Sequence, residues 1–171
     1  MNSCLRKLNP EGDGEALHAI FGDEQCCYYM TGPAFETPAE TIALLKKITV
    51  GTEHTSWAIV DDPNGEALGR VSMIPRGEAI WEAAIMMAPA AQGKGLATRA
   101  LSEAIDIMFD KHGARRIYAD IDPDNAACLR AFEKLGFTRE GLLRAQWKTH
   151  IGVRDSVIMG LIDSDARPWK K

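Results

Sequence analysis

The pattern of hydrophobic and polar positions predicts a chain in which helices and strands alternate, with no internal repeat and no low-complexity tract. In its first third, the pattern predicts a short strand at residues 3–8, a helix at 11–21 and a second helix at 39–50. Residues 22–38, between the helices, show no clear period. That stretch is long enough to be a functional loop or to contain a helix that the pattern does not locate.

Three successive strands are predicted for the middle of the chain, at residues 56–60, 66–74 and 79–87. Residues 61–65 join the first two, and their Asp-Asp-Pro-Asn-Gly sequence favours a hairpin turn. The Pro-Arg-Gly sequence at residues 75–77 predicts a second turn. The third strand is nearly apolar on both faces, so we expect it to be central in a sheet and buried.

The alternation continues to the end of the chain. Apolar residues at helical spacing predict an amphipathic helix that starts at Gly95 and ends near Gly113. The elements expected after it are a strand at 115–121, a helix at 125–135 stopped by Gly136, and two closing strands at 137–147 and 154–162. The polar tail, residues 163–171, is expected to be frayed.

Length and composition narrow the class of protein. The chain has 171 residues, of which 46% are hydrophobic and 26% charged, as in a single soluble globular domain that folds without a disulfide or a metal. Its net charge of -4 argues against nucleic acid as a partner, because that binding depends on Lys and Arg. No secretory signal and no membrane-length apolar stretch is visible, so we expect no membrane contact.

The cysteines carry no metal or redox motif. Cys4, Cys26, Cys27 and Cys128 show neither a CxxC spacing nor a companion pair of histidines. They therefore predict no zinc site and no redox dithiol. We expect reduced thiols, and with them a cytoplasmic location and no metal cofactor.

The strand-to-helix passage at residues 85–98 carries the clearest chemical signal. The strand stops at Pro89, and a turn containing Gly93 and Gly95 opens the amphipathic helix. Unpaired N–H groups and the positive end of the helix dipole make such a turn a site for an anion, although a glycine-loosened helix start without a ligand is the alternative. A Walker loop is excluded by Ala88 and Gly95, and a dinucleotide fingerprint matches weakly because residue 98 is Thr.

A short motif in this turn matches a known family. The sequence Gln92-x-x-Gly95-x-Ala97 resembles the pyrophosphate-binding motif of the GNAT superfamily of acyl-CoA-dependent N-acyltransferases. An Asn at the start of the next helix, Asn125, and Gly136-Phe137 before the closing strands follow in the order and spacing of that family. Residues 137–157 further resemble its Rim-type branch, which includes the N-terminal acetyltransferases of ribosomal proteins.

The resemblance is most specific over residues 80–162, and it implies one acetyltransferase domain over residues 1–171. The fold it implies is an α/β domain with a mixed, mostly antiparallel sheet. That sheet is split into a V between two parallel central strands and flanked by helices. The two parallel strands, ending near Met87 and Ile121, would separate and hold the pantetheine arm of acetyl-CoA between them.

The same resemblance implies which residues bind acetyl-CoA. Main-chain groups of Ile85, Met86 and Met87 would pair with pantetheine like an added strand, and the N–H of Met87 would hold the oxyanion. Asn125 would contact pantetheine, cap its helix, or do both. Lys94 would reach phosphate or solvate the turn. The turn that takes the pyrophosphate comprises Gln92, Gly93, Lys94, Gly95, Leu96, Ala97 and Thr98.

Acetyl transfer to an amine needs a group that accepts a proton, and the departing thiolate can use a donor. Glu82 is the candidate base, because an acid in an apolar strand needs a wet cavity or a partner; the alternative is a strand-edge residue that faces solvent or pairs with an Arg. For the donor, Phe132 stands where many relatives carry Tyr, and Cys128 stands where Rim-type relatives often carry Ser. Cys128 is therefore the candidate acid or a small buried apolar residue.

The predicted function is transfer of acetyl from acetyl-CoA to a primary amine by direct attack in a ternary complex. The acceptor is a protein N-terminus or a small amine such as an aminoglycoside, polyamine or amino acid, and a noncatalytic acyl-CoA sensor is the third alternative. A homodimer is also plausible. Asp155 is expected to form a buried structural bond or pair, with a substrate contact as the alternative, and His54 and His150 are expected to be structural. Further candidates to line an acceptor pocket are Tyr28, Tyr29, Phe35, Trp81 and Trp147.

Overall fold

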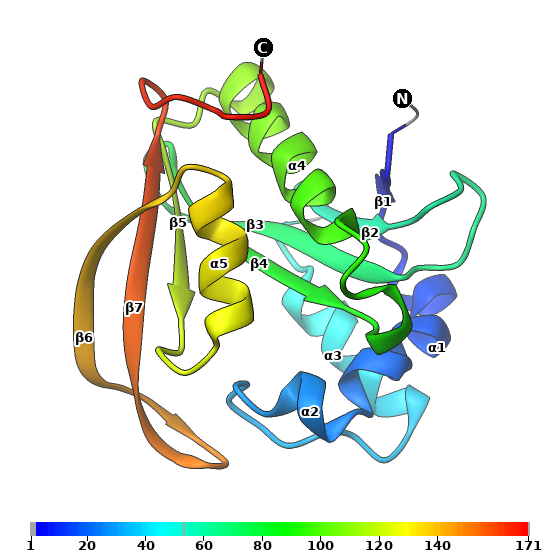
Figure 1. The fold of residues 1–171 in the computed structure, drawn as a ribbon. Coiled ribbons are helices and arrows are strands. Elements are labelled where there is room, and N and C mark those ends of the chain that lie inside the picture. Colours follow the sequence, from blue (N-terminus) through cyan, green and yellow to red (C-terminus); the bar gives the residue numbers. More distant parts are fainter. Residues whose placement is uncertain (1–2, 53, 171) are drawn as a thin grey trace.

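The computed structural model describes residues 3–52 and 54–170. In chain order the elements are β1 (Leu5–Lys7), α1 (Pro10–Phe21), α2 (Glu24–Cys27), α3 (Pro38–Ile48), β2 (Ser56–Ile59), β3 (Gly69–Gly77), β4 (Ile80–Met87), a 3₁₀ turn (Pro89–Ala91), α4 (Leu96–His112), β5 (Arg116–Ile121), α5 (Ala126–Lys134), β6 (Thr138–Thr149) and β7 (Gly152–Ile162). Figure 1 shows the arrangement. The short α2 is the helix that the irregular stretch conceals.

The strands form one seven-stranded sheet in the order β1-β2-β3-β4-β5-β7-β6. Every neighbouring pair is antiparallel except β4 and β5, which are parallel. This parallel pair requires a crossover, and α4 supplies it. The mixed, mostly antiparallel sheet expected from the sequence is thereby confirmed.

Helices cover both faces of the sheet. On one face, buried residues of α4 such as Leu101 and Ile105 pack with Val71 and Ile117 of the strands, and α5 adds Phe132. On the other face, a second cluster joins α1 and α3 to the sheet through side chains such as Leu17 and Leu45. Figure 1 shows the β6–β7 hairpin extending as one side of the molecule.

The helix caps explain why the predicted helices begin and end where they do. Thr37 and Glu40 form a reciprocal capping box at the start of α3, with Pro38 at the first helical position. The helix α4 ends at Gly113, which adopts a left-handed φ of 62°. These boundaries agree with the sequence prediction to within two residues.

The predicted turn at residues 75–77 is wrong. β3 continues to Gly77, and the turn follows at Glu78 and Ala79. Its register against β4 shifts between Pro75 and Gly77, so the strand accommodates Pro75, which cannot donate a ladder hydrogen bond, beside a bulge.

Two expectations about burial are also wrong. β4 is central but only Ala83 and Met87 are buried, because residues of this strand line a pocket. The tail is not frayed: Asp106 of α4 accepts hydrogen bonds from Arg167 and from the indole of Trp169, both at 2.9 Å. Trp169 packs against the main core, so composition alone misjudged this segment.

Candidate active site

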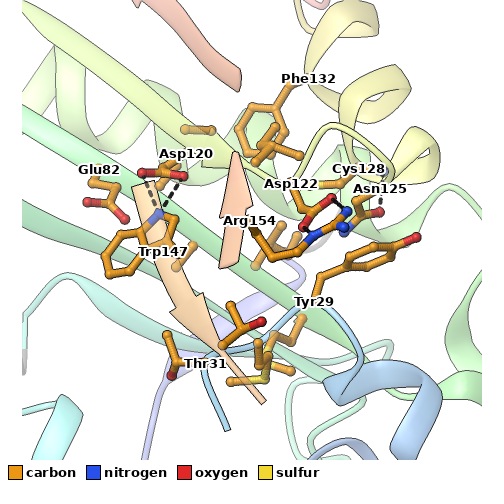
Figure 2. A pocket seen from close by; sticks show the side chains of 18 of the residues that line it. Tyr29, Thr31, Glu82, Asp120, Asp122, Asn125, Cys128, Phe132, Trp147 and Arg154 are labelled. Carbon is orange, nitrogen blue, oxygen red and sulfur yellow. Dashed lines mark hydrogen bonds and ion pairs between the residues drawn. The ribbon is translucent and has the colours of Figure 1, made fainter. Parts of the chain in front are cut away.

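The two parallel strands separate towards their C-terminal ends. β4 and β5 pair only over residues 80–82 and 116–118, whereas β4 continues to Met87 and β5 to Ile121. A pocket of about 350 Å³ lies at this split (Figure 2). Its walls come from β3, β4, β5, α5, α2 with the segment that follows it, and the β6–β7 hairpin.

Main-chain groups of β4 point into the split. Gly69 and Met87 lie opposite each other, and the N–H of Ala88 donates to the carbonyl of Leu68 at 2.8 Å. In an antiparallel ladder, this bond shows that Gly69 and Met87 form a non-hydrogen-bonded pair. The N–H and C=O of Met87 therefore point away from β3. The alternation along a strand directs those of Ile85 the same way.

Of the three residues predicted to pair with pantetheine, Met86 therefore differs from the other two. It lies opposite Arg70, at the alternate position of the ladder, so its main-chain groups face β3. Its side chain lines the pocket and packs against the cluster under α1 and α3. Only Ile85 and Met87 present main-chain groups to the split.

The turn after β4 has the backbone that its glycines suggest. Gly93 and Gly95 have φ values of 74° and 75°, and a Cβ at either would meet no other atom within 4 Å. Glycine is therefore needed for the left-handed backbone and not to avoid a neighbour in the protein. Both residues are exposed, as is Lys94 between them.

The first turn of α4 presents its N–H groups outwards. Gly95 is the N-cap and supplies no side chain, and its carbonyl accepts the first helical hydrogen bond, from Arg99 at 3.1 Å. The N–H groups that precede this bond, and that an anion would meet at the positive end of the helix, belong to Leu96, Ala97 and Thr98.

Gln92 has a different role from its neighbours in the turn. Its amide Nε2 donates to the carbonyl of Met87 at 3.1 Å and contacts the Sγ of Cys26 at 3.7 Å. The side chain thus ties the turn back to the end of β4. Burial raises the pKa of the Cys26 thiol to about 11, so this thiol is protonated at neutral pH.

Glu82 lines the pocket and has the Arg partner that the alternative interpretation anticipated. Its Oε2 accepts from Arg76 Nε at 2.7 Å and from the hydroxyl of Tyr118 at 3.1 Å. The Glu82 side chain is 19% exposed, so the ion pair leaves it accessible to the pocket. Burial and the neighbouring Glu82 raise the pKa of Tyr118.

Asn125 and Cys128 meet at the start of α5. The side-chain oxygen of Asn125 accepts from the N–H of Cys128 at 3.2 Å, so Asn125 is the predicted N-cap, and both residues line the pocket. Burial raises the pKa of the Cys128 thiol to about 11. Phe132 also lines the pocket and is buried against Phe137.

An acidic residue of β5 that the sequence analysis did not single out faces the pocket. Both carboxylate oxygens of Asp120 accept from Trp147 Nε1 at 3.1 Å (Figure 2), and Oδ1 also accepts from the Ser156 hydroxyl. Among the described residues, Asp120 makes no ion pair.

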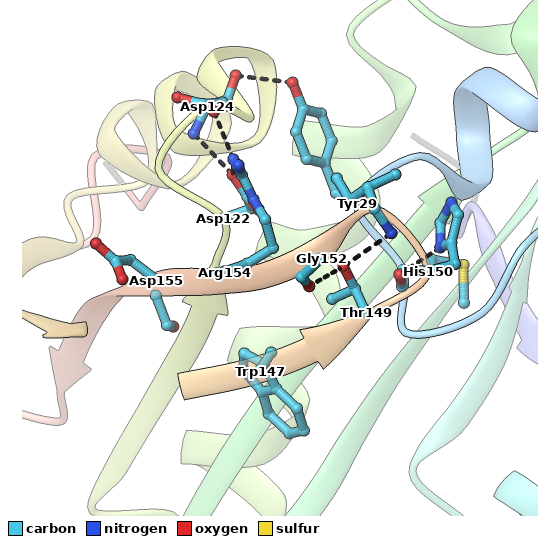
Figure 3. Close-up of polar contacts among 12 residues, drawn as sticks. Tyr29, Asp122, Asp124, Trp147, Thr149, His150, Gly152, Arg154 and Asp155 are labelled. Carbon is cyan, nitrogen blue, oxygen red and sulfur yellow. Dashed lines mark hydrogen bonds and ion pairs between the residues drawn. The ribbon is translucent and has the colours of Figure 1, made fainter. Parts of the chain in front are cut away.

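Asp122, in the loop between β5 and α5, is a second carboxylate of the pocket wall, and an arginine binds it. Arg154 binds Asp122 through two hydrogen bonds of 2.8 Å and also bonds Asp124, which fixes the β5–α5 loop to β7 (Figure 3). The Arg154 guanidinium holds the pKa of Asp122 below its usual range. This pair is accordingly neutralised within the pocket wall.

The segment after α2 reaches across the split. The Tyr29 hydroxyl donates to the carbonyl of Asp124 at 3.1 Å, and at the tip of the β6–β7 hairpin His150 bonds the carbonyls of Met30 and Thr31, both at 3.1 Å (Figure 3). These contacts join three parts of the chain that are far apart in sequence. They support the structural role expected for His150.

Asp155 was expected to form a buried bond. It is half-buried, lines the pocket, and its Oδ1 accepts from the N–H of Ala145 at 2.7 Å. Ala145 has a φ of 51° within a bulge of β6. The bond is therefore structural, as expected, while the burial is only partial.

Of the aromatic residues expected to line an acceptor pocket, Tyr29 and Trp147 do so. Sequence patterns gave little signal for two other pocket residues: Asp120 occupies an ordinary strand position, and Arg154 belongs to a strand whose pairing is not visible before the fold is known. The alternation of β5 would place Asp120 and Tyr118 on one face, and this was the one available clue.

The described part of the chain shows no cluster of three or more His, Cys, Asp or Glu residues that could hold a metal ion. All four cysteines are free thiols. Within the same residues, no helix is long and apolar enough to cross a membrane.

Known proteins resemble both the sequence and the fold. The family model described as an acetyltransferase (GNAT) domain matches residues 3–138. The chain belongs to the GNAT acetyltransferase family. Accordingly it is an N-acetyltransferase that uses acetyl-CoA, and the outward N–H groups at Ile85, Met87 and the start of α4 fit that cosubstrate.

Individual relatives share moderate identity with this GNAT enzyme. Spermidine N(1)-acetyltransferase of Escherichia coli K12 is 30% identical over 159 residues, covering 91% of this chain and 83% of that protein. A probable GNAT acetyltransferase from Chromobacterium violaceum has a TM-score of 0.84 at 25% identity, and the match covers 95% of this chain and 85% of that one. Vibrio cholerae spermidine N-acetyltransferase in complex with CoA and spermine has a TM-score of 0.77 at 23% identity, and the match covers 94% of this chain and 95% of that one. This likeness shows the fold alone.

Proposed function

We propose that this GNAT enzyme acetylates a primary amine of a small molecule. The observation that carries the proposal is the limited volume of the pocket, which two contacts bridge. Tyr29 bonds the β5–α5 loop and His150 bonds the segment after α2, which leaves a volume of about 350 Å³. That volume is at the small end of ligand pockets, whereas a protein N-terminus would need an open groove.

The charges of the pocket support an acceptor that carries an ammonium group. Glu82 and Asp122 each have an arginine partner, but Asp120 and Asp155 have none among the described residues. A partly buried carboxylate without a cation attracts one. Asp120, on the same face of the sheet as Glu82, would therefore hold the protonated amine beside the split before it loses its proton.

The residues that would hold acetyl-CoA follow from the directions of their N–H groups. Those of Gly93 to Thr98 would bind the pyrophosphate, and those of Ile85 and Met87 would pair with pantetheine. Asn125 lies close enough to the split to contact pantetheine while it caps α5. Gln92 is a positioning residue in this proposal, since its amide holds the carbonyl of Met87.

Acetyl-CoA supplies a thioester, whose carbonyl carbon bonds to the amine nitrogen as the C–S bond breaks. Met87 N–H would donate to the carbonyl oxygen as it gains negative charge. Glu82 would accept the proton of the amine, directly or through one water, and the hydrogen bond from Arg76 holds its carboxylate in place. The Cys128 thiol would donate a hydrogen bond to the departing sulfur and keep its own proton.

The alternatives predict different chemistry. A Rim-type enzyme would acetylate a protein N-terminus, and a sensor would bind acetyl-CoA without turnover. Among the relatives are proteins named spermidine N(1)-acetyltransferase and aminoglycoside N(6')-acetyltransferase type 1, which favours a small acceptor. Carboxylates in the pocket agree with this preference.

Release of free CoA thiol with two sets of acceptors tests the proposal. One set contains small primary amines, including diamines, polyamines and amino acids, and the other contains short peptides with a free N-terminus. We expect turnover with members of the first set only. Turnover confined to peptides would establish the N-terminal alternative, and acetyl-CoA binding without any turnover would establish the sensor.

A further inference from the structure

Arg70 is a buried arginine of the pocket wall to which the proposed function gives no role. It lies on β3, is 6% exposed, and lines the same pocket as Glu82 and Asp120. One of its guanidinium nitrogens, Nη2, donates to the hydroxyl of Ser72 at 2.8 Å. Its Nε has no hydrogen-bond partner in the described structure.

No carboxylate of the described chain pairs with this guanidinium. Burial lowers the pKa of Arg70 to about 10, which leaves the group charged at neutral pH. A buried charge without a partner is costly, since neither water nor an opposite charge compensates it. Arg154, in the same pocket wall, shows the contrasting arrangement, with Asp122 and Asp124 both bonded to it.

The position of Arg70 relates it to the reacting end of the pocket. Arg70 lies opposite Met86, Ser72 opposite Ala84, and Ile74 opposite Glu82. Directly opposed residues share a face of the sheet, so the Arg70, Ser72 and Glu82 side chains project from the same face. The bond to Ser72 directs the guanidinium along β3 towards Glu82, above a position where Ala84 occupies little space.

The distance from Arg70 to the split follows from the spacing of strands. Neighbouring strands lie about 4.8 Å apart, and the split begins on the far side of β4. An anion on Arg70 and an amine at the split are then separated by about one to two strand spacings, roughly 5–10 Å. An acceptor that spans both would carry the two groups several bonds apart.

We propose that Arg70 binds a carboxylate of the acceptor, so that the substrate is a small amino acid-like molecule whose reacting primary amine lies several bonds from its carboxylate. The guanidinium lines the pocket with its Nε–H unpartnered, and a planar guanidinium matches the two oxygens of a carboxylate. This inference rests on the proposed function and specifies its substrate class.

The proposal explains the composition of the pocket better than a purely cationic acceptor does. A polyamine would place positive charge beside a buried guanidinium that has no compensating anion. An amino acid-like acceptor would meet Asp120 with an ammonium group and Arg70 with its carboxylate. Each of these two unpaired charges then has an opposite charge on the substrate.

Two matched pairs of amines test this: lysine against cadaverine, and ornithine against putrescine. Within each pair the molecules differ by one carboxylate. The readout is kcat/KM from release of free thiol at saturating acetyl-CoA. We expect the wild-type enzyme to prefer the carboxylate-bearing member of at least one pair by about 10- to 100-fold, the effect of a hydrogen-bonded charge pair.

Variants assign that preference to Arg70. Arg70→Met should bring the ratio within each pair close to one while acetyl-CoA binding, measured by calorimetry, is retained, and Arg70→Lys should keep part of the preference. Arg116→Met is the matched control, because Arg116 pairs with Glu140 on the same sheet outside the pocket, and it should keep the wild-type ratio.

Each result decides a separate statement. Turnover in which the diamines equal or exceed the amino acids in the wild-type enzyme would overturn the role of Arg70 and leave the small-amine function standing. An amino acid preference that survives in folded Arg70→Met would also overturn it. If none of the four amines, nor any other small amine, is acetylated, the proposed function fails and this inference fails with it.

Discussion

Trp147 of β6 holds Asp120 of β5 across the intervening strand β7, its indole Nε1 lying 3.1 Å from each carboxylate oxygen. The register of β6 against β7 shifts between Leu143 and Trp147, and Asp155 bonds the main chain of this bulge at Ala145. Bulges redirect side chains. This one brings the indole to the pocket face, where it orients a carboxylate without neutralising it.

Asp120→Asn is expected to raise KM for the amine by about 10- to 100-fold and to leave KM for acetyl-CoA unchanged, because it removes a charged partner of the ammonium group only. Trp147→Phe should give a smaller increase, since it loses the orientation of Asp120 and keeps its charge. Initial-rate kinetics with each substrate varied in turn measures both. Asp110→Asn on α4 is the control, and an unchanged amine KM in Asp120→Asn would remove Asp120 from acceptor binding.

Gly95→Tyr is expected to weaken acetyl-CoA binding by at least about 10- to 100-fold, because the side chain would cover N–H groups that bond phosphate. Gly113→Tyr at the other end of α4 is a matched control. Both glycines have a left-handed φ and open space around the missing Cβ, so both variants carry a similar strain of about 1–2 kcal/mol. Calorimetry with acetyl-CoA compares them, and equal affinities would contradict the assignment of this turn.

Glu82→Gln should lower kcat by about 10²- to 10⁴-fold if its carboxylate accepts the proton of the amine, with little change in acetyl-CoA affinity. Glu140→Gln makes the same chemical change in an Arg–Glu pair outside the pocket and controls for the loss of an ion pair. Single-turnover rates separate chemistry from binding. A Glu82→Gln enzyme as fast as Glu140→Gln would exclude Glu82 as the base.

The buried thiol of Cys128 has a pKa of about 11, because burial disfavours the thiolate. It should remain protonated through neutral pH, so alkylation by iodoacetamide should be slow at pH 8 and accelerate only as the pH approaches 11. Cys128→Ala should cost less than about tenfold in kcat, the effect of one hydrogen bond. Rapid alkylation of Cys128 at pH 8 with parallel loss of activity would contradict this role.

Local sequence signals predicted most of the fold. The helix boundaries, the hairpin turn and the strand-to-helix passage around Gly95 depend on residues close together in the chain, and the structure follows them. The prediction of a turn at Pro75 was wrong because a bulge can accommodate proline within a strand. The prediction of a frayed tail was wrong because the tail binds Asp106, about 60 residues away, and no local pattern reveals that contact.

The candidate site divides in the same way. The turn at Gly93 and Gly95 was visible because a backbone conformation has a local sequence signature. Arg70 and Asp120 could not be recognised from the sequence, since their roles depend on the residues that surround them in the fold. A buried arginine without an anion, and a carboxylate held by an indole from another strand, can be recognised only after the strands are paired.

Mass spectrometry of a single reaction mixture tests whether the enzyme transfers acetyl directly from acetyl-CoA to a small primary amine. We expect free CoA and N-acetylated amine in equal amounts, both dependent on the amine, with no acetyl group left on the protein. An acetyl group on Cys128 or Cys26 before amine is added, or CoA release without acetylated amine, would contradict direct transfer.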